Sequence, residues 1–158
     1  MPKRSAGLLM YRRMGRNIEV FLVHPGGPFW AKKDIGAWSI PKGEYSENEN
    51  PLEAAKREFK EETGFTAEGK FKELPEIIQK GGKRVKAWCF EGYCDPDNIK
   101  SNTFKIEWPP RSGKVKEFPE IDRAAWFSLE IAKQKILKSQ VPFIEALEKL
   151  LTNEERCN

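Results

Sequence analysis

Runs of apolar and aromatic residues, separated by turn-forming residues, divide the first part of the chain into short β-strands. Such runs cover residues 5–11 and 18–23, and the segment 12–17 between them has the composition of a turn. We therefore expect these two strands to form a hairpin. The glycines and prolines of residues 24–28 exclude regular structure, and residues 35–40 are predicted to form the next strand.

The same pattern continues through the later part of the chain, interrupted by one long polar segment. Strands are predicted over residues 71–79 and 84–94, with Gly81-Gly82 as the hairpin turn between them. Residues 95–119 contain few apolar residues, so we interpret them as a long connection of the kind that is often functional in a compact domain. A short strand over residues 124–127 follows.

A helix over residues 51–63 is predicted by its apolar spacing and by its end signals. Asn50 is a suitable N-cap, Pro51 fits the first helical position, and Gly64 fits the C-terminal cap. One arc of this helix carries apolar residues that can pack against a core, namely Leu52, Ala55 and Phe59.

Two further helices are predicted near the C-terminus. One is capped by Ser128 and runs towards Leu137, and the other begins at Pro142. The last helix has an apolar stripe that we expect to pack on the core, formed by Phe143, Leu147, Leu150 and Leu151. Strands and helices in this order predict an α/β fold with a mixed sheet between helices.

The helix predicted over residues 51–63 also carries three carboxylates on one flank. Glu58, Glu61 and Glu62 occupy positions i, i+3 and i+4, so their side chains fall within an arc of roughly 100°. Like charges so placed repel, and convergent carboxylate oxygens suit Mg²⁺, which keeps water and substrate phosphates in its other positions. The alternative is a solvated helix face with i, i+4 ion pairs, such as Arg57 with Glu61.

The residues around these carboxylates form a longer motif. From Gly43 to Phe65 the chain reads GEYSENENPLEAAKREFKEETGF, which resembles the Nudix box at every defining position. Phe59 and Phe65 occupy positions where that family usually has an aliphatic residue. Residues 37–42 and 125–129 resemble the strand before the box and a late strand-to-helix junction of the same family, so the resemblance spans most of the chain.

This resemblance implies an α/β/α sandwich and a pyrophosphohydrolase that depends on Mg²⁺, with Mn²⁺ as an alternative ion. The metal ligands that it implies are the carboxylates of Glu58, Glu61 and Glu62 and the carbonyl of Lys42. Arg57 and Glu49 would orient the catalytic helix, although a structural ion pair would use the same two residue types.

The general base is open between the box and a later loop, because Nudix enzymes use both. Glu58 is the candidate within the box. Glu107, Glu117 and Glu120 lie on or just beyond the long connection, where a fourth carboxylate could reach the metals when the loop closes. We favour Glu107 because apolar and aromatic neighbours flank it, with Glu117 next.

The family resemblance implies a nucleoside diphosphate joined to another group as substrate. The tyrosine and proline that mark two family subgroups shortly after the box are missing, since residues 80–83 read Lys-Gly-Gly-Lys. Residues 82–88 and the segment around Trp126 resemble the dinucleoside polyphosphate and nucleoside triphosphate branch, so we expect a diadenosine tetraphosphate-like substrate or a nucleoside triphosphate. The alternatives are pyrophosphate removal from RNA 5′ ends and a nucleotide-binding module without catalysis.

Basic and aromatic residues supply the candidates for substrate binding. Lys42, Lys83 and Arg84 could bind an extended polyphosphate, although basic residues on a half-exposed strand are often only solvated. Trp108, within the polar connection, is the best candidate to stack on a base. For His24 we expect a structural role rather than substrate contact, because no acidic partner is near it in the sequence.

Size and charge fit one domain over residues 1–158 and argue against several classes of protein. The net charge of +4 is modest, so no dedicated nucleic-acid-binding surface is expected. Neither a long apolar run nor a signal-peptide pattern is present, which predicts a cytoplasmic protein without a membrane span. Cys89, Cys94 and Cys157 lack metal-site spacing and are interpreted as reduced structural thiols, the first two on opposite faces of a strand.

Overall fold

Strand β1 (Arg4–Met14) lies at the centre of a six-stranded mixed sheet. The structure is a computed structural model that describes residues 3–157, with the backbone alone from residue 155. β1 forms an antiparallel hairpin with β2 (Asn17–Pro25), and β2 pairs with β8 (Ile121–Ser128), also antiparallel. The predicted N-terminal hairpin is therefore confirmed.

Further pairings of β1 complete the sheet. β1 pairs in parallel with β5 (Arg84–Glu91), which pairs with β4 (Lys72–Ile78) to give the order β4-β5-β1-β2-β8. A short strand, β3 (Lys42–Glu44), pairs with the start of β1 opposite residues 5–7. This pairing places Gly43 opposite Ala6, near the N-terminal end of β1.

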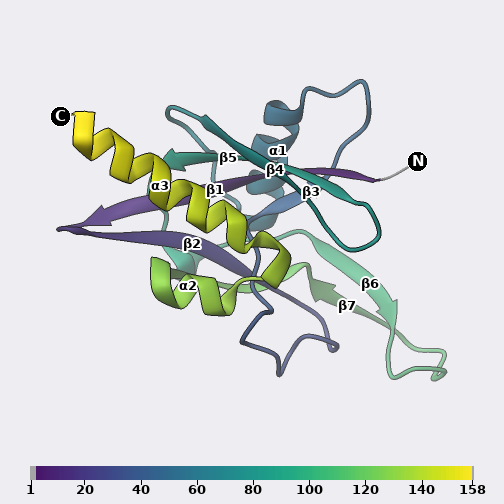
Figure 1. Ribbon diagram of the computed structural model, residues 1–158. Helices are drawn as coiled ribbons and strands as arrows, with labels where there is room; N and C mark the ends of the chain where they lie inside the picture. The colour runs from purple at the N-terminus through teal and green to yellow at the C-terminus, as the bar shows by residue number, and fades with distance from the viewer. Residues whose placement is uncertain (1–2, 158) are drawn as a thin grey trace.

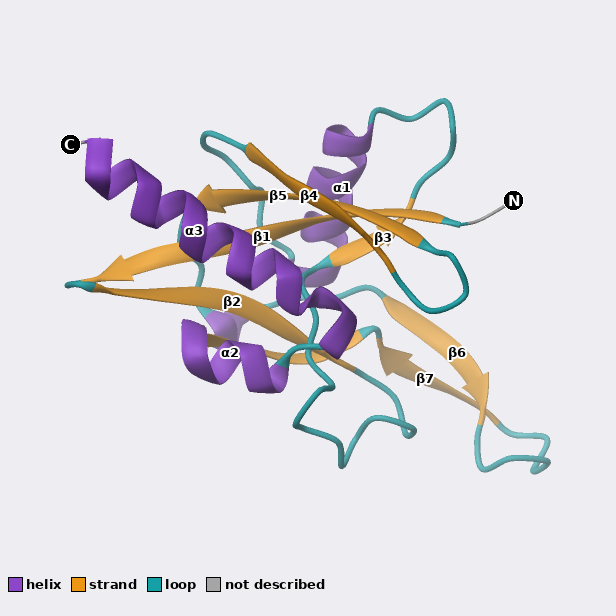
Figure 2. Cartoon of the chain, in the orientation of Figure 1, coloured by secondary structure: helices purple, strands orange, loops and turns teal. Residues whose placement is uncertain are grey.

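Helices cover both faces of the sheet (Figures 1 and 2). Helix α1 (Pro51–Thr63) covers one face, and α2 (Leu129–Lys135) and α3 (Val141–Cys157) cover the other, joined by the 3₁₀ turn η2 (Lys138–Gln140). Each face has its own buried cluster: Phe21, Phe59 and Phe90 belong to the α1 side, and Ile40, Phe143 and Leu147 to the α3 side. The predicted α/β arrangement, with a mixed sheet between helices, is confirmed.

The ends of α1 follow the local signals in the sequence. The Asn50 side chain accepts a hydrogen bond from the Glu53 N–H at 3.1 Å, and Pro51 occupies the first turn, where no N–H is needed. Gly64 ends the helix with a positive φ of 83°, and its N–H donates to the Lys60 carbonyl at 2.7 Å. Both ends of the helix that carries the carboxylates are thus fixed by local capping residues.

The strand predicted over residues 35–40 is wrong. This segment consists of turns followed by two isolated bridges, one between Ser39 and Val23 and one between Trp38 and Ile136. The regular strand begins only at Lys42. Ser39 pairs with β2 and Trp38 pairs with the residue after α2, so the segment is held by two different elements and does not form a continuous strand.

The interpretation of residues 95–119 as an irregular connection is also wrong. After a 3₁₀ turn, η1 (Pro96–Asn98), the chain forms a separate antiparallel hairpin of β6 (Thr103–Glu107) and β7 (Val115–Pro119). Figure 1 shows this hairpin projecting from the main sheet. Phe104 on β6 faces Phe118 on β7 with a ring separation of 6.1 Å, which gives the hairpin a small apolar contact of its own.

Two of the cysteines are free and buried within the described part of the chain. Cys89 belongs to the cluster on the α3 side and Cys94 to that on the α1 side, although Cys94 follows β5 rather than forming part of it. The side chain of Cys157 lies outside what the structure describes. Among the described residues, no helix is both long and apolar enough to cross a membrane.

Candidate active site

Close packing between β3 and α1 positions the carboxylate of Glu58. Gly43 lies on β3 directly beneath this carboxylate, and a Cβ atom at Gly43 would overlap the Glu58 carboxyl group. The glycine is therefore required by space and not by an unusual φ angle. Gly43 and Glu58, both part of the 43–65 motif, are thus packed directly against each other.

Arg57 holds the neighbouring carboxylates in a fork of hydrogen bonds. Its Nε and Nη2 donate to Glu49 at 2.9 and 3.2 Å, and its Nη1 donates to Glu58 at 2.9 Å and to Glu61 at 3.2 Å. Hydrogen bonding to Glu49 and then to Glu61 raises the pKa of Arg57, and the same bond lowers the pKa of Glu49. These groups are partly or fully exposed, so the fork orients the carboxylates more than it stabilises the fold.

Two carboxyl groups on the inner side of α1 are difficult to ionise without a counter-ion. Burial, and then the charge of Glu58, raise the pKa of Glu62 to about 8, against the opposing effect of Lys42. Burial, and then the charge of Glu61, raise the pKa of Glu58. Glu120 contributes to both shifts, so its carboxylate is close enough to interact with the two helical ones.

A chain of backbone hydrogen bonds brings Glu120 to the end of α1. The Asn102 N–H donates to the Glu61 carbonyl at 2.9 Å, and the Glu120 N–H donates to the Asn102 carbonyl at 2.8 Å. In a third hydrogen bond of this series, the Gly26 N–H donates to the Glu120 carbonyl, also at 2.8 Å. Glu120 therefore lies beside the carboxylates of α1, although 58 residues separate it in sequence from Glu62.

The structure does not bring Glu107 and Glu117 to this cluster. Glu107 accepts a hydrogen bond at 2.7 Å from the Arg111 N–H in the turn of the β6–β7 hairpin, and Glu117 accepts one at 2.6 Å from the Thr103 hydroxyl. Both carboxylates are exposed and serve the hairpin itself. Of the three later carboxylates that the sequence suggested, the one ranked last has the position suited to the site.

Two lysines lie next to the acidic cluster. Burial, and then the nearby charge of Lys83, lower the pKa of Lys42 to about 8, while Glu62 opposes this effect. Two ammonium groups held together beside a cavity favour an anion. Arg84 has a different position: it donates to Glu76 at 2.9 Å and lines a separate cavity with Arg4 and Tyr45, rather than the one beside Lys42.

A cavity of about 220 Å³ opens beside Glu62 and Glu120. Its lining combines these two carboxylates and Lys42 with one aromatic residue, Trp30, and with apolar residues of several elements: Val23, Pro25, Ala37, Ile40, Ile121 and Leu137. Trp30 is not recognisable as a site residue from the sequence, because its loop has no periodic pattern. Trp108 is not among the lining residues; its ring packs edge-on against Phe29 at 5.4 Å.

His24 has a buried structural position, as expected, and its acidic partner comes from a distant part of the sequence. Its Nδ1 lies 2.9 Å from Asp122 Oδ1, and its Nε2 lies 2.6 Å from the Lys33 carbonyl. Asp122 is 98 residues away in sequence and reaches His24 through the pairing of β2 with β8. The imidazole is fully buried, so it ties a loop to the sheet rather than facing substrate.

The carboxylates fit a hard divalent ion, judged by their chemistry. In the described residues, no three acidic, histidine or cysteine groups converge closely enough to form a coordination sphere, and Arg57 donates hydrogen bonds to Glu58 and Glu61. Glu58, Glu62 and Glu120 nonetheless interact through their charges. An ion with oxygen preference would relieve this repulsion, and no soft ligand is needed for it.

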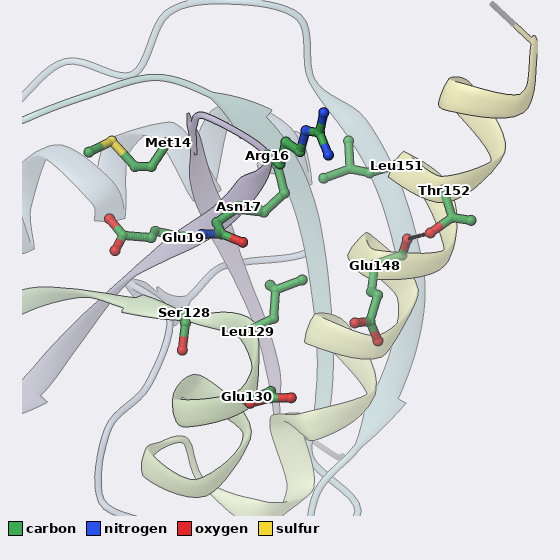
Figure 3. Close-up of a pocket in the computed structure, with 11 residues that line it drawn as sticks. Met14, Arg16, Asn17, Glu19, Ser128, Leu129, Glu130, Glu148, Leu151 and Thr152 are labelled. Carbon is green, nitrogen blue, oxygen red and sulfur yellow. Dashed lines mark hydrogen bonds between the residues drawn. The ribbon is translucent and has the colours of Figure 1, made fainter.

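A larger cavity, of about 560 Å³, lies away from the carboxylate cluster (Figure 3). Its walls come from the β1–β2 turn, the start of α2 and the outer part of α3, so it contains no residue of the 43–65 motif. Its acidic groups are partly neutralised, because Glu19 pairs with Arg12 and Glu148 with Lys133. The smaller cavity beside Glu62 is therefore the better candidate for the active site.

The pKa of Glu62 predicts a stability profile for the metal-free protein. Because its folded-state pKa of about 8 exceeds the ordinary 4.5, the folded state keeps a proton that the unfolded state releases between these values, and stability falls as pH rises from about 5 to 8. We expect Tm in EDTA to fall over this range less steeply for Glu62→Gln than for the wild type. Identical slopes for the two proteins would contradict the assignment.

Comparison with known proteins connects this site with a family. The NUDIX domain model matches residues 1–147. The asymmetrical bis(5′-nucleosyl)-tetraphosphatase of Rattus norvegicus is 35% identical over 103 residues, which are 58% of this chain and 66% of the rat protein, so the chain spans just under two thirds of that relative. The RNA pyrophosphohydrolase of Bartonella henselae is 30% identical over 148 residues, covering 81% of this chain and 77% of the relative.

Solved structures show the same fold. A binary complex of the C. elegans Ap4A hydrolase has a TM-score of 0.66 at 24% identity, covering 96% of this chain and 98% of that one. A mutT/nudix family protein from Listeria innocua has the same TM-score at 15% identity, with coverage of 100% and 99%. The family model and the sequence relatives together show that this chain belongs to the Nudix family of hydrolases.

Proposed function

We propose that this protein hydrolyses a phosphoanhydride bond of a dinucleoside polyphosphate, such as diadenosine tetraphosphate, or of a nucleoside triphosphate. The observation that carries the proposal is the position of Glu62 and Glu120 in the lining of a cavity that also contains Lys42 and Trp30, with Glu58 close enough to interact with both carboxylates. Carboxylates for a metal, a cation for phosphate and an aromatic ring for a base are the groups that such a substrate requires.

Glu58, Glu61, Glu62 and the carbonyl of Lys42 would hold Mg²⁺ or Mn²⁺. When bound, the ion neutralises charge on the phosphate oxygens and lowers the pKa of water. Arg57 and Glu49 keep the carboxylates of α1 in position, because their hydrogen bonds connect the loop before the helix to Glu58 and Glu61. Lys42 and Lys83 bind the non-bridging oxygens of the polyphosphate.

We assign the general base to Glu120 in place of Glu107. A water molecule attacks one phosphorus atom, its proton passes to the Glu120 carboxylate, and the bond between that phosphorus and the bridging oxygen breaks, so that the leaving phosphate departs with the electron pair. Glu120 is exposed and therefore accessible to water, and its charge acts on Glu58 and Glu62. Glu58, the candidate within the box, is engaged by Arg57.

The relatives support two candidate substrates. The rat relative at 35% identity is named as a tetraphosphatase of bis(5′-nucleosyl) compounds, which supports the dinucleoside polyphosphate. The Bartonella relative is named as an RNA pyrophosphohydrolase and covers more of the chain, which favours RNA 5′ ends as the second candidate. Both reactions cleave a phosphoanhydride, so the carboxylate cluster is suited to either one.

A substrate panel tests the proposal directly. We expect the protein with Mg²⁺ to cleave diadenosine tetraphosphate into two unequal nucleotides, with kcat/KM at least about tenfold above that for triphosphorylated RNA and for ADP-ribose. Products are resolved by chromatography, and water labelled with ¹⁸O identifies the phosphorus attacked. A higher kcat/KM for RNA would transfer the assignment to the second candidate, and absence of turnover on the whole panel would overturn both.

A further inference from the structure

The loop of residues 26–37, here called the Trp30 loop, forms one wall of the cavity beside Glu62. Trp30 is its contribution to the lining, and the ring is partly buried there. The loop contains no regular secondary structure, yet both of its ends are fixed to other elements. The fixed ends of the loop therefore hold the Trp30 ring in place at the cavity, where the ring can contact a ligand.

Two glycines fix the first end of the Trp30 loop. The Gly26 N–H donates to the Glu120 carbonyl at 2.8 Å, and a Cβ at Gly26 would overlap the Pro119 carbonyl. Gly27 has a φ of +95°, and a Cβ there would lie 2.8 Å from the ring of Phe104. A side chain at either glycine would push the loop away from the β6–β7 hairpin and from Glu120.

The second end of the Trp30 loop is fixed through side chains and backbone. The Lys33 carbonyl contacts the buried His24 ring at 2.6 Å, and Asp34 accepts a hydrogen bond from Trp38 Nε1 at 2.8 Å and also pairs with Lys135. The Gly36 N–H donates to the Gln134 carbonyl of α2 at 3.0 Å. A loop held in this way presents its side chains in one arrangement before any ligand binds, which reduces the entropy lost on binding.

The surroundings of Trp30 match one end of an anionic, aromatic ligand. The Lys33 ammonium lies over the Trp30 ring, 5.0 Å from its centroid, and Lys42 lines the same cavity. A volume of about 220 Å³ is smaller than the ~300–1,000 Å³ usual for a complete small-molecule ligand, so the cavity fits one end of a longer molecule. Trp30 supplies a flat apolar surface, and Lys42 supplies charge for a phosphate.

We propose that the indole of Trp30 is the stacking platform for one nucleobase of the substrate, with the attached phosphates directed to Lys42 and the carboxylates of α1. This inference rests on the proposed function and specifies which nucleotide end the cavity takes. Because the Gly26 N–H joins the Trp30 loop to Glu120, the platform and the general base are positioned by one hydrogen-bonded unit. Trp30 is thus a specificity-determining residue rather than a catalytic one.

Trp30→Ala tests the platform. Loss of one stacked base is expected to raise KM for diadenosine tetraphosphate roughly 5- to 150-fold, with kcat changed by less than about threefold. Trp30→Phe should restore most of the affinity, because its ring can still stack. Ile35→Ala is the matched control, since Ile35 is an apolar residue of the same loop that is 66% exposed and outside the cavity lining; its KM should equal that of the wild type.

Binding measurements separate this proposal from the proposed reaction. Without turnover, ADP titrated into the wild type should quench tryptophan fluorescence, and its Kd, measured by calorimetry in both proteins, should weaken by the same factor in Trp30→Ala. Inorganic tripolyphosphate, which has no base, should bind both proteins equally. Equal weakening for ADP and tripolyphosphate, or no weakening for either, would overturn the platform. Absence of turnover on the substrate panel would overturn the reaction and leave this binding result to be judged separately.

Discussion

Glu62→Gln is expected to lower kcat/KM by at least about 10³-fold, because it removes a negative ligand from the site that would hold the metal, and the ion supplies several kcal/mol of charge stabilisation in the transition state. The fold should remain intact. With a pKa of about 8, Glu62 is largely protonated at neutral pH in the metal-free protein, so a glutamine has nearly the same shape and the same charge. A loss of activity would therefore report on the metal site and not on stability.

Three measurements check this expectation. Turnover of diadenosine tetraphosphate gives the activity, calorimetry with Mn²⁺ gives the metal affinity, and Tm gives the stability. Glu53→Gln is the matched control, since Glu53 lies in the first turn of the same helix, is 68% exposed and pairs only with Lys56 among the described residues. If Glu62→Gln retained activity within about threefold of the wild type, Glu62 would not be a metal ligand.

Helix α1 was predictable because its signals are local. Asn50, Pro51 and Gly64 fix its ends within a turn of the residues they cap, and the spacing of Glu58, Glu61 and Glu62 follows directly from the helical repeat. The contact of Gly43 with Glu58 also involves residues only 15 positions apart, and it belongs to the same motif. Because these contacts join residues close together in the sequence, the half of the candidate site formed by Gly43 and α1 could be predicted from the sequence.

The other half of the site depends on contacts between distant segments. The hydrogen bonds of His24 with Asp122 and of Gly26 with Glu120 form because β2 and β8 are neighbours in the sheet. No short-range sequence pattern predicts that pairing. The β6–β7 hairpin was missed for a different reason. Phe104 and Ile106 do alternate with polar residues in β6, but each strand has only five residues and lies in a segment rich in charged residues and prolines.

This difference also explains why Glu107 was preferred over Glu120 at first. Apolar neighbours indicated that Glu107 was held in place, and it is, but in the turn of the hairpin. Glu120 is also flanked by apolar residues, Pro119 and Ile121, but its position is set by backbone hydrogen bonds to Asn102 and Gly26, which do not depend on side-chain type. The position of a residue held by its backbone is therefore difficult to predict from the sequence.

Glu120→Gln is expected to lower kcat by roughly 10²- to 10³-fold and to change KM by less than about threefold, because a general base acts on the attacking water and does not hold the ground-state substrate. Glu107→Gln, the same substitution in the hairpin turn, should leave kcat within about twofold of the wild type. The pH profile adds a second readout: the acid limb of kcat should be lost in Glu120→Gln and retained in Glu107→Gln.

The pair of variants distinguishes among Glu107, Glu120 and Glu58 as the general base. If Glu107→Gln lost activity and Glu120→Gln did not, the hairpin would have to move its carboxylate to the cluster during the reaction, as the sequence alone suggested. If both retained full kcat, the proton would pass to Glu58, which would then have to leave its hydrogen bond with Arg57. The observed geometry favours Glu120, because its carboxylate is open to water and already interacts with Glu58 and Glu62, so no rearrangement is required before the proton is transferred.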